Sequence, residues 1–364
     1  MSSASVAADV GTPLLRVVDE DFRRATVRVQ ARPTRFYLNL TETCQLRCSH
    51  CITRAPVMTE QGTARSMTSE VLEALRPHLR HATYVGFTHA GEPMLSPVFI
   101  PVLDLLRAER NGQPTVIHLL SNGQAMTETR FAEAVQRGVN SLSFSVDGMS
   151  ARTHDLLRIG SHIERLLPRI AALAALRRRE GWDVRMGIAW TISRDNITEL
   201  PELIRFVAES GLDWVKLEEM YPINGCAEGL LVDERVLAEA VANAEREAEA
   251  RGVRLLDHTR DMQVWKCRLH DDERMARFSR MDDFVNRMEI NSCRLPYELC
   301  CVEPDGMVKP MSFHHPPAGN VLQQDLMAIW NSPMFFMARQ ESVRARLCLM
   351  QGPTCSPDVG PTGW

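Results

Sequence analysis

The chain has 364 residues, a length that suits one large domain or a domain with a smaller appendage. A net charge of −4 excludes the basic field that binds nucleic acid or an anionic membrane surface. No stretch approaches the ~20 apolar residues that span a bilayer, and the N-terminal sequence lacks the features of a secretory signal. We therefore expect a cytoplasmic protein with no nucleic-acid and no membrane partner.

Residues 1–35 show no clear period and predict a short N-terminal extension. From residue 36 onward, β-rich runs alternate with amphipathic segments, which is typical of a parallel sheet with helices outside. Six such units are too few for an eight-stranded barrel, so a partial (βα)6 barrel over 36–225 or an open doubly wound sheet is predicted. Strands are expected over 36–41, 83–88, 115–121, 141–146, 184–192 and 213–219, and helices over 66–82, 97–110, 127–138, 161–180 and 199–211.

The pattern changes after residue 220. A long helix is predicted over 232–252, with Gly252 ending it, within a helical linker that covers 226–266. The composition then turns rich in loops, proline and cysteine, which predicts a small C-terminal domain over 267–364.

The segment TETCQLRCSHC begins at Thr41, the last residue of the first predicted strand, and contains Cys44, Cys48 and Cys51, spaced C-x3-C-x2-C. Disulfides do not persist in the cytosol, so this cluster favours metal or iron–sulfur ligation. Three thiolates can hold three irons of a cubane cluster and leave the fourth iron open to an exogenous ligand. A zinc site is the alternative, with His50 as its local fourth ligand.

This motif after the first strand of a (βα)6 series resembles that of the radical S-adenosylmethionine superfamily. The resemblance implies a [4Fe–4S] cluster whose open iron is chelated by S-adenosylmethionine, and an electron donor such as flavodoxin or ferredoxin. Reductive cleavage of the cofactor then gives a 5′-deoxyadenosyl radical that abstracts a hydrogen from substrate. His50 occupies the position where the family places a residue that touches the adenine.

Further motifs follow the later predicted strands, where ligands gather in such sheets. THAGEP is similar to the Gly-Gly-Glu motif that receives the methionine amino group, and SVDG matches positions that face ribose or substrate. Each motif taken alone is also compatible with a simple turn. The cofactor-binding residues implied are Ala90, Gly91, Glu92, Ser121, Asn122, Ser145, Asp147, Thr191, Ser193 and Arg194, the last as a guanidinium for the cofactor carboxylate.

Residues 293–311 and 319–335 resemble the SPASM/twitch extension of the same superfamily, which carries auxiliary [4Fe–4S] clusters. Met311 stands where the hairpin of that extension normally returns to a cysteine. The five cysteines beyond residue 292 support one auxiliary cluster, and Cys300 and Cys301 would point to opposite faces of a strand. Buried apolar cysteines are the alternative. The expected ligands are Cys293, Cys300 or Cys301, Cys348 and Cys355.

The end of the sixth strand supplies the catalytic candidates. Alternation places Lys216 and Glu218 on one face, where they could orient a polar substrate or act as a base; a surface ion pair is equally compatible. Cys226 could return a hydrogen atom to a substrate radical and give epimerisation, whereas without such a donor dehydrogenation would follow. An inert, buried Cys226 is the alternative.

Peptide-modifying relatives often have an N-terminal leader-binding module, and only 35 residues precede the first strand here. We therefore expect a small-molecule substrate, a polar natural-product intermediate such as a sugar, aminocyclitol, nucleoside or amino acid derivative. A peptide- or protein-modifying enzyme (a RiPP or sulfatase-type maturase) and a non-enzymatic iron–sulfur scaffold are the alternatives.

Overall fold

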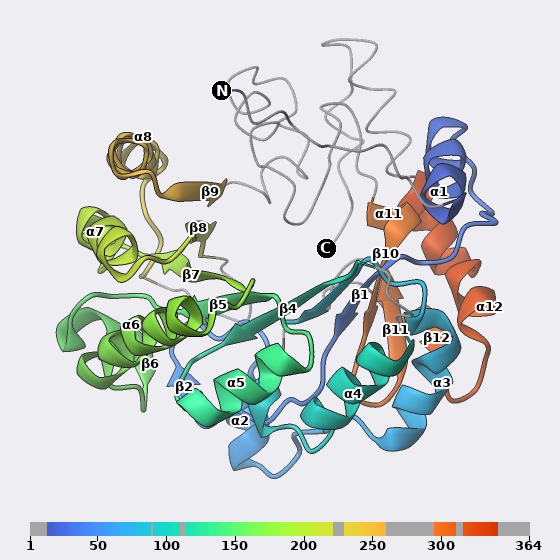
Figure 1. Ribbon diagram of the computed structural model, residues 1–364. Helices are drawn as coiled ribbons and strands as arrows, with labels where there is room; N and C mark the ends of the chain where they lie inside the picture. Colours follow the sequence, from blue (N-terminus) through green and yellow to red (C-terminus); the bar gives the residue numbers. More distant parts are fainter. Residues whose placement is uncertain are drawn as a thin grey trace, which may run out of the picture.

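A ten-stranded sheet forms the centre of the protein in the computed structural model, in the order β12-β11-β10-β1-β3-β4-β5-β7-β8-β9 (Figure 1). The structure describes residues 13–88, 90–109, 114–220, 229–259, 295–310 and 316–340. Neighbouring strands from β10 to β9 are parallel, whereas β11 and β12 continue the sheet antiparallel. The strands are β1 (Arg35–Leu38), β3 (Tyr84–Phe87), β4 (Val116–Ser121), β5 (Ser141–Ser145), β7 (Arg185–Ile192), β8 (Trp214–Glu219), β9 (Arg254–His258), β10 (Leu299–Val302), β11 (Met307–Pro310) and β12 (Gly319–Asn320).

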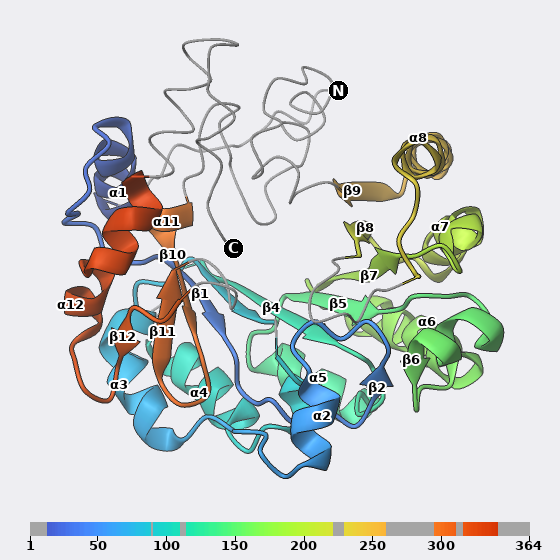
Figure 2. The same cartoon turned by 180° about the vertical axis from the view of Figure 1, so that it is seen from behind.

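Helices between the parallel strands lie along the convex side of the curved sheet (Figures 1 and 2). This arrangement confirms the predicted partial barrel and excludes the doubly wound alternative, which places helices on both faces. Gly252 ends the last of these helices with a φ of 67°, a left-handed conformation that glycine adopts without steric cost. They are α3 (Ser69–Leu79), α4 (Phe99–Glu109), α5 (Glu128–Gln136), α6 (Ile163–Glu180), α7 (Leu200–Ser210) and α8 (Glu234–Arg251).

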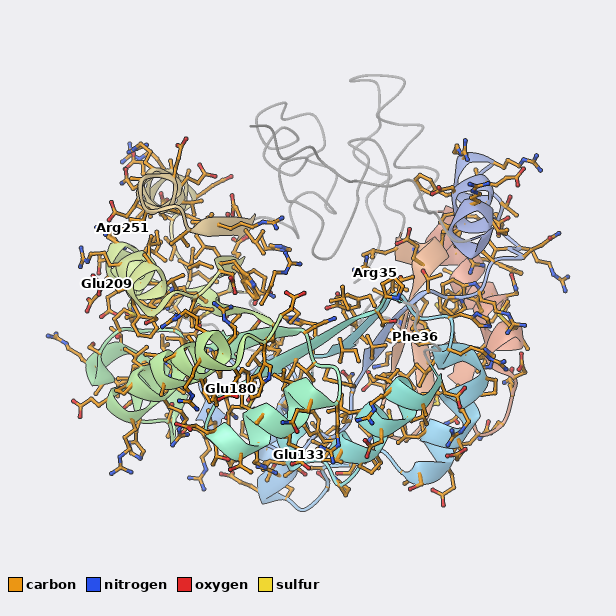
Figure 3. All side chains as sticks on the ribbon, viewed as in Figure 1. Arg35, Phe36, Glu133, Glu180, Glu209 and Arg251 are labelled. Atoms are coloured by element: carbon orange, nitrogen blue, oxygen red, sulfur yellow. The ribbon has the colours of Figure 1, made fainter. Side chains whose placement is uncertain are left out.

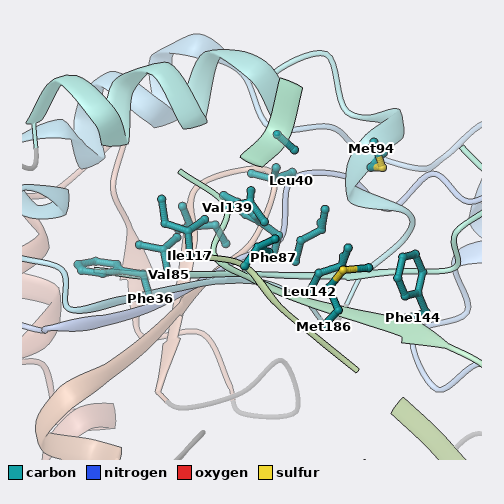
Figure 4. Packing of buried hydrophobic residues seen from close by; sticks show 14 of the residues in the cluster. Phe36, Leu40, Val85, Phe87, Met94, Ile117, Val139, Leu142, Phe144 and Met186 are labelled. Atoms are coloured by element: carbon teal, nitrogen blue, oxygen red, sulfur yellow. The ribbon is translucent and has the colours of Figure 1, made fainter. Parts of the chain in front are cut away.

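The two faces of the sheet have different chemistry. Phe36, Val85 and Leu142 belong to the apolar core beneath the helices, and Figure 4 shows how closely such side chains pack there. The concave face is polar: Arg35 lies over the ring of Tyr84, at 4.7 Å from its centroid, on the side opposite Phe36 (Figure 3). Burial of the convex face therefore holds the fold together, while the concave face remains available for chemistry.

The structure differs from the sequence prediction after residue 226. The segment expected to be a helical linker contains β9 as well as α8, and β9 pairs with β8 in parallel. The C-terminal region expected to be separate contributes β10, which pairs with β1 and so continues the same sheet. Pairing partners this distant in sequence leave no local signal. The domain boundaries remain a prediction.

The N-terminal extension folds onto the C-terminal part of the chain. Helix α1 (Pro13–Arg23) lies beside α11 (Leu295–Glu298), and the ring of Phe22 meets that of Tyr297 edge-on at 5.4 Å. Trp330, at the end of α12 (Leu326–Trp330), donates its indole N–H to the carbonyl of Ala31 at 3.0 Å. None of the helices in the described ranges has the length and apolar character needed to cross a membrane.

Arg339 completes this connection as a fully buried cation. Its guanidinium donates to three carbonyl oxygens, those of Pro296 at 3.0 Å, Val27 at 2.9 Å and Trp330 at 2.9 Å. The carbon at the centre of the guanidinium also lies 4.7 Å from the centroid of the Trp330 ring, a cation–π contact. One side chain thus joins the N-terminal extension, α11 and α12.

Replacing Arg339 with Ala should lower the free energy of unfolding of the apo protein by about 3 kcal/mol, because buried carbonyls lose their donors and a cavity remains. Urea denaturation measures the change. Arg251→Ala is the control: its side chain is 36% exposed and pairs with Glu247 within α8, so about 0.5 kcal/mol is expected. Equal losses for the two variants would contradict the role of Arg339.

Candidate functional site

The segment that contains Cys44, Cys48 and Cys51 (residues 41–51, here called the cysteine loop) follows β1 and lies where the parallel strands end. Within it, β2 (Arg47–Cys48) forms a two-stranded antiparallel ribbon with β6 (Arg158–Ile159), and α2 (Ala55–Glu60) follows the last cysteine. In that ribbon Cys48 lies directly opposite Arg158. The backbone N–H of Cys44 donates to the hydroxyl of Thr59 at 3.0 Å, which connects the loop to α2.

Gly91 fixes the start of this loop through close backbone contact. Its N–H donates to Thr41 O at 2.9 Å, and the N–H of Glu92 donates to Thr43 O at 2.8 Å. A Cβ at position 91 would lie 2.1 Å from the carbonyl oxygen of Thr43. Only glycine therefore allows the turn after β3 to pack against the chain that leads into Cys44.

The Glu92 carboxylate is directed into the protein. It is 2% exposed and accepts hydrogen bonds from Ser121 Oγ at 2.8 Å and from the backbone N–H of Asn122 at 2.8 Å. Burial raises the pKa of Glu92, and these hydrogen bonds oppose the rise. Among the described contacts, this carboxylate positions the turn after β4.

Asn122 connects the turn after β4 to the cysteine loop. Its side-chain oxygen accepts from Gln45 Nε2 at 3.1 Å, and its Nδ2 lies 3.8 Å from Cys44 Sγ, within hydrogen-bond range of a sulfur. Ser121 and Asn122 were predicted to bind the cofactor from their place after a strand, and the structure brings both into contact with this loop or with Glu92.

Asp147 is a fully buried residue whose carboxylate accepts three hydrogen bonds and whose backbone carbonyl accepts a fourth. It accepts hydrogen bonds from Arg158 Nε at 2.6 Å, His50 Nε2 at 3.0 Å and the backbone N–H of Thr191 at 2.7 Å, while Asn196 Nδ2 donates to its carbonyl oxygen at 3.0 Å. Although burial opposes ionisation, Arg158 and His50 lower the pKa of Asp147 well below its usual value. The carboxylate is therefore charged at neutral pH.

The thiols of Cys44 and Cys48 lie in environments that need a positive charge before they ionise. Burial raises the pKa of Cys44 to about 12 and also raises that of Cys48, against the opposing effect of Arg158. Bound iron supplies such a charge and deprotonates its thiol ligands. Among the described residues, no three Cys, His, Asp or Glu side chains converge to hold a single metal ion. One thiolate for each iron, as in a cubane, fits this donor set.

Buried polar atoms around the strand ends also fit a polar cofactor. His50 Nδ1, Thr88 Oγ1 and Ser193 Oγ are buried and have no hydrogen-bond partner within the described part of the chain. Buried polar groups are normally paired, so these atoms can serve a bound molecule. Ser145, predicted for cofactor or substrate contact, is 9% exposed at the end of β5.

The structure places Arg194 differently from the sequence expectation. Its side chain is 67% exposed, and its nearest ionic partner is Asp195 at 3.7 Å. Arg158, which the sequence analysis did not select, supplies the guanidinium beside the cysteine loop. Arg158 reaches the cysteine loop because β6 pairs with β2, which lies more than a hundred residues earlier in the chain. The sequence around Arg158 therefore gives no indication of this contact.

The remaining predicted residues divide into those the structure describes and those it does not. Lys216 Nζ lies 2.8 Å from Glu218 Oε1, as strand alternation predicted. Cys300 packs in the apolar core beneath the helices, and Cys301 packs with Tyr37 and Tyr84 on the other face. The predictions for Cys226, Cys293, Cys348 and Cys355 concern residues outside the described ranges.

Comparisons with known proteins agree with this geometry. A model of the Radical SAM superfamily matches residues 38–207, and one of the SPASM iron–sulfur cluster-binding domain matches residues 293–355. Pre-heme d1 synthase of Dinoroseobacter shibae is 27% identical over 177 residues, 48% of this chain and 40% of that protein. AdoMet-dependent heme synthase of Methanosarcina barkeri is 28% identical over 180 residues, 47% of this chain and 46% of that protein. The chain thus spans less than half the length of either relative.

The fold resembles that of Streptococcus suis SuiB bound to S-adenosylmethionine, with a TM-score of 0.62 and 14% sequence identity, over 85% of this chain and 68% of SuiB. At this identity the likeness concerns the fold.

Gly91→Ala should displace the cysteine loop, because the added Cβ would overlap Thr43 O. We expect at least half of the reconstituted iron of the N-terminal cluster to be lost, as measured by iron analysis and the electron paramagnetic resonance (EPR) signal that responds to S-adenosylmethionine. Gly62→Ala is the control, since a Cβ there meets no atom within 4 Å and only its left-handed φ adds strain, of about 1 kcal/mol. Wild-type cluster content in Gly91→Ala would contradict the role of this contact.

Proposed function

Since the chain belongs to the radical S-adenosylmethionine superfamily and carries a C-terminal SPASM domain, we propose that it is an enzyme that abstracts a hydrogen atom from a small polar substrate. The family implies a [4Fe–4S] cluster, S-adenosylmethionine and an auxiliary iron–sulfur cluster. Together they supply a 5′-deoxyadenosyl radical after one-electron reduction. Cys44, Cys48 and Cys51 would hold the first cluster.

The observation that carries the proposal is the Lys216–Glu218 pair on the concave face. The side chains are 18% and 38% exposed, so both remain accessible to a molecule bound against β8. Glu218 pairs in register with Thr191, whose N–H donates to Asp147. The ion pair is therefore one strand away from the residues that hold the cysteine loop, a place suited to a substrate of the radical.

Polar groups further along the concave face satisfy one another. His118 on β4 meets the hydroxyl of Ser141 at 2.8 Å through Nδ1 and that of Ser143 at 3.1 Å through Nε2. Burial, together with the charge of Lys216, lowers the pKa of His118 to about 3, so the ring is neutral. These three side chains are buried and paired, so the accessible Lys216–Glu218 pair is the part of this polar surface that would meet a substrate.

Within this surface, Lys216 would orient an electronegative group of the substrate and Glu218 a hydroxyl or ammonium group. Glu218 would also act as a base where loss of a hydrogen atom is followed by loss of a proton and of one electron, which the auxiliary iron–sulfur cluster would accept, as in dehydrogenation. Cys226 as hydrogen-atom donor would instead give epimerisation.

A peptide or protein substrate is the alternative, and a solved SuiB complex contains the precursor peptide SuiA. The names of two relatives concern heme synthesis, which makes tetrapyrroles a third class to test. A non-enzymatic iron–sulfur scaffold would cleave no S-adenosylmethionine. These possibilities differ in what triggers 5′-deoxyadenosine release.

The anaerobically reconstituted, dithionite-reduced protein should release 5′-deoxyadenosine from S-adenosylmethionine, as measured by chromatography. The triple variant Cys44→Ala, Cys48→Ala and Cys51→Ala should release none and lose about four irons per chain, the content of one cubane. Iron left in that variant reports the auxiliary cluster. Zinc in the wild-type protein, or cofactor cleavage by the triple variant, would refute the proposal.

Small aminocyclitols and sugars, rather than peptides or tetrapyrroles, should accelerate 5′-deoxyadenosine release. Glu218→Gln should raise the KM for the active compound about tenfold or more, because a hydrogen bond to a charged group is worth about 1.5–3 kcal/mol. Glu209→Gln removes a carboxylate from the exposed face of α7 and serves as the control (Figure 3). Acceleration by peptides alone would favour the maturase alternative.

A further inference from the structure

We propose that Arg158 is a positioning residue that raises the reduction potential of the N-terminal [4Fe–4S] cluster by donating a hydrogen bond to the sulfur of Cys48. The inference depends on the proposed function only in that Cys44, Cys48 and Cys51 hold this cluster. It requires neither a known substrate nor turnover.

The β2–β6 ribbon places the guanidinium beside the sulfur. Cys48 and Arg158 are paired across the ribbon, and Arg158 Nη1 lies 3.9 Å from Cys48 Sγ, within hydrogen-bond range of a sulfur acceptor. The next residue strengthens this register, because the N–H of Ser49 donates to Leu157 O at 2.9 Å. The contact therefore follows from backbone pairing and does not depend on a freely moving side chain.

Asp147 holds the guanidinium from its other edge. Its carboxylate accepts from Arg158 Nε at 2.6 Å, which leaves Nη1 directed at the sulfur. The Arg158 side chain is only 13% exposed, so solvent screens its charge weakly. Although burial opposes the charge, the Asp147 carboxylate raises the pKa of Arg158, which stays cationic.

This geometry favours the reduced state of the cluster. Reduction adds one electron from an external one-electron carrier to the cluster and its thiolates, and Arg158 exchanges neither an electron nor a proton. A nearby cation and an N–H···S hydrogen bond both stabilise the added negative charge, and hydrogen bonds to the sulfurs are among the factors that set such potentials. The charge of Asp147 partly offsets the cation, whereas the hydrogen bond from Arg158 to the sulfur is not offset by Asp147.

Matched variants separate this effect from general damage to the ribbon. Arg158→Met removes the charge and the donor at similar length, whereas Arg158→Lys keeps the charge without the planar fork. Arg47→Met is the control, because Arg47 precedes Cys48 in β2, is 68% exposed and pairs with Glu60. Its charge is largely screened by water.

The experiment is an EPR-monitored redox titration of full-length reconstituted protein. Only the signal that changes on addition of S-adenosylmethionine is followed, which excludes the auxiliary cluster. Arg158→Met should shift the midpoint potential to a more negative value, Arg158→Lys should shift it less, and Arg47→Met should leave it unchanged.

Unchanged potentials in both Arg158 variants, or an equal shift in Arg47→Met, would overturn the proposal. If Arg158→Met fails to retain iron, the comparison of Arg158→Lys with Arg47→Met decides. If the wild-type protein shows no S-adenosylmethionine-responsive signal, the proposed function itself fails, which is a different result from an unshifted midpoint.

Discussion

The buried carboxylate of Asp147 is the interaction on which the site depends. It joins the cysteine loop through His50, the β2–β6 ribbon through Arg158 and strand β7 through the N–H of Thr191. A charge taken out of water is costly unless it is paired and hydrogen-bonded, and here every neighbouring segment supplies a donor. The cysteine loop, the β2–β6 ribbon and β7 must take up one relative arrangement to satisfy this carboxylate. The need to pair the buried charge therefore specifies the geometry of the cysteine loop.

The sheet separates the work of folding from the work of chemistry. Its convex face buries aliphatic and aromatic side chains under α3 to α8, which accounts for most of the stability (Figure 4). The concave face instead carries polar groups that satisfy one another, such as His118 with Ser141 and Lys216 with Glu218. Substitutions on the concave face can therefore change its polar groups while the convex core still maintains the fold.

The sequence was informative where structure follows local pattern. Alternating runs predicted the barrel strands and helices to within a few residues, because each parallel strand is buried and each helix buries one side. Lys216 and Glu218 met as expected, since residues two apart in a strand share a face.

Features that depend on distant pairing could not be read in this way. The joining of β10 to β1, the approach of Arg158 to Cys48 and the contact of Trp330 with Ala31 all link residues more than a hundred positions apart. Glu92 shows a second limit: its motif was recognised, but the direction of its carboxylate depends on the turn after β4.

Strand β1 lies between β3 and β10, so it is an edge strand until the ribosome has made β10, some 260 residues later. During synthesis its unpaired backbone would be open to wrong partners. The nascent chain therefore has reason to depend on chaperones, or on slow translation near the C-terminal region, more than the mature sheet suggests, in which β1 is paired on both sides.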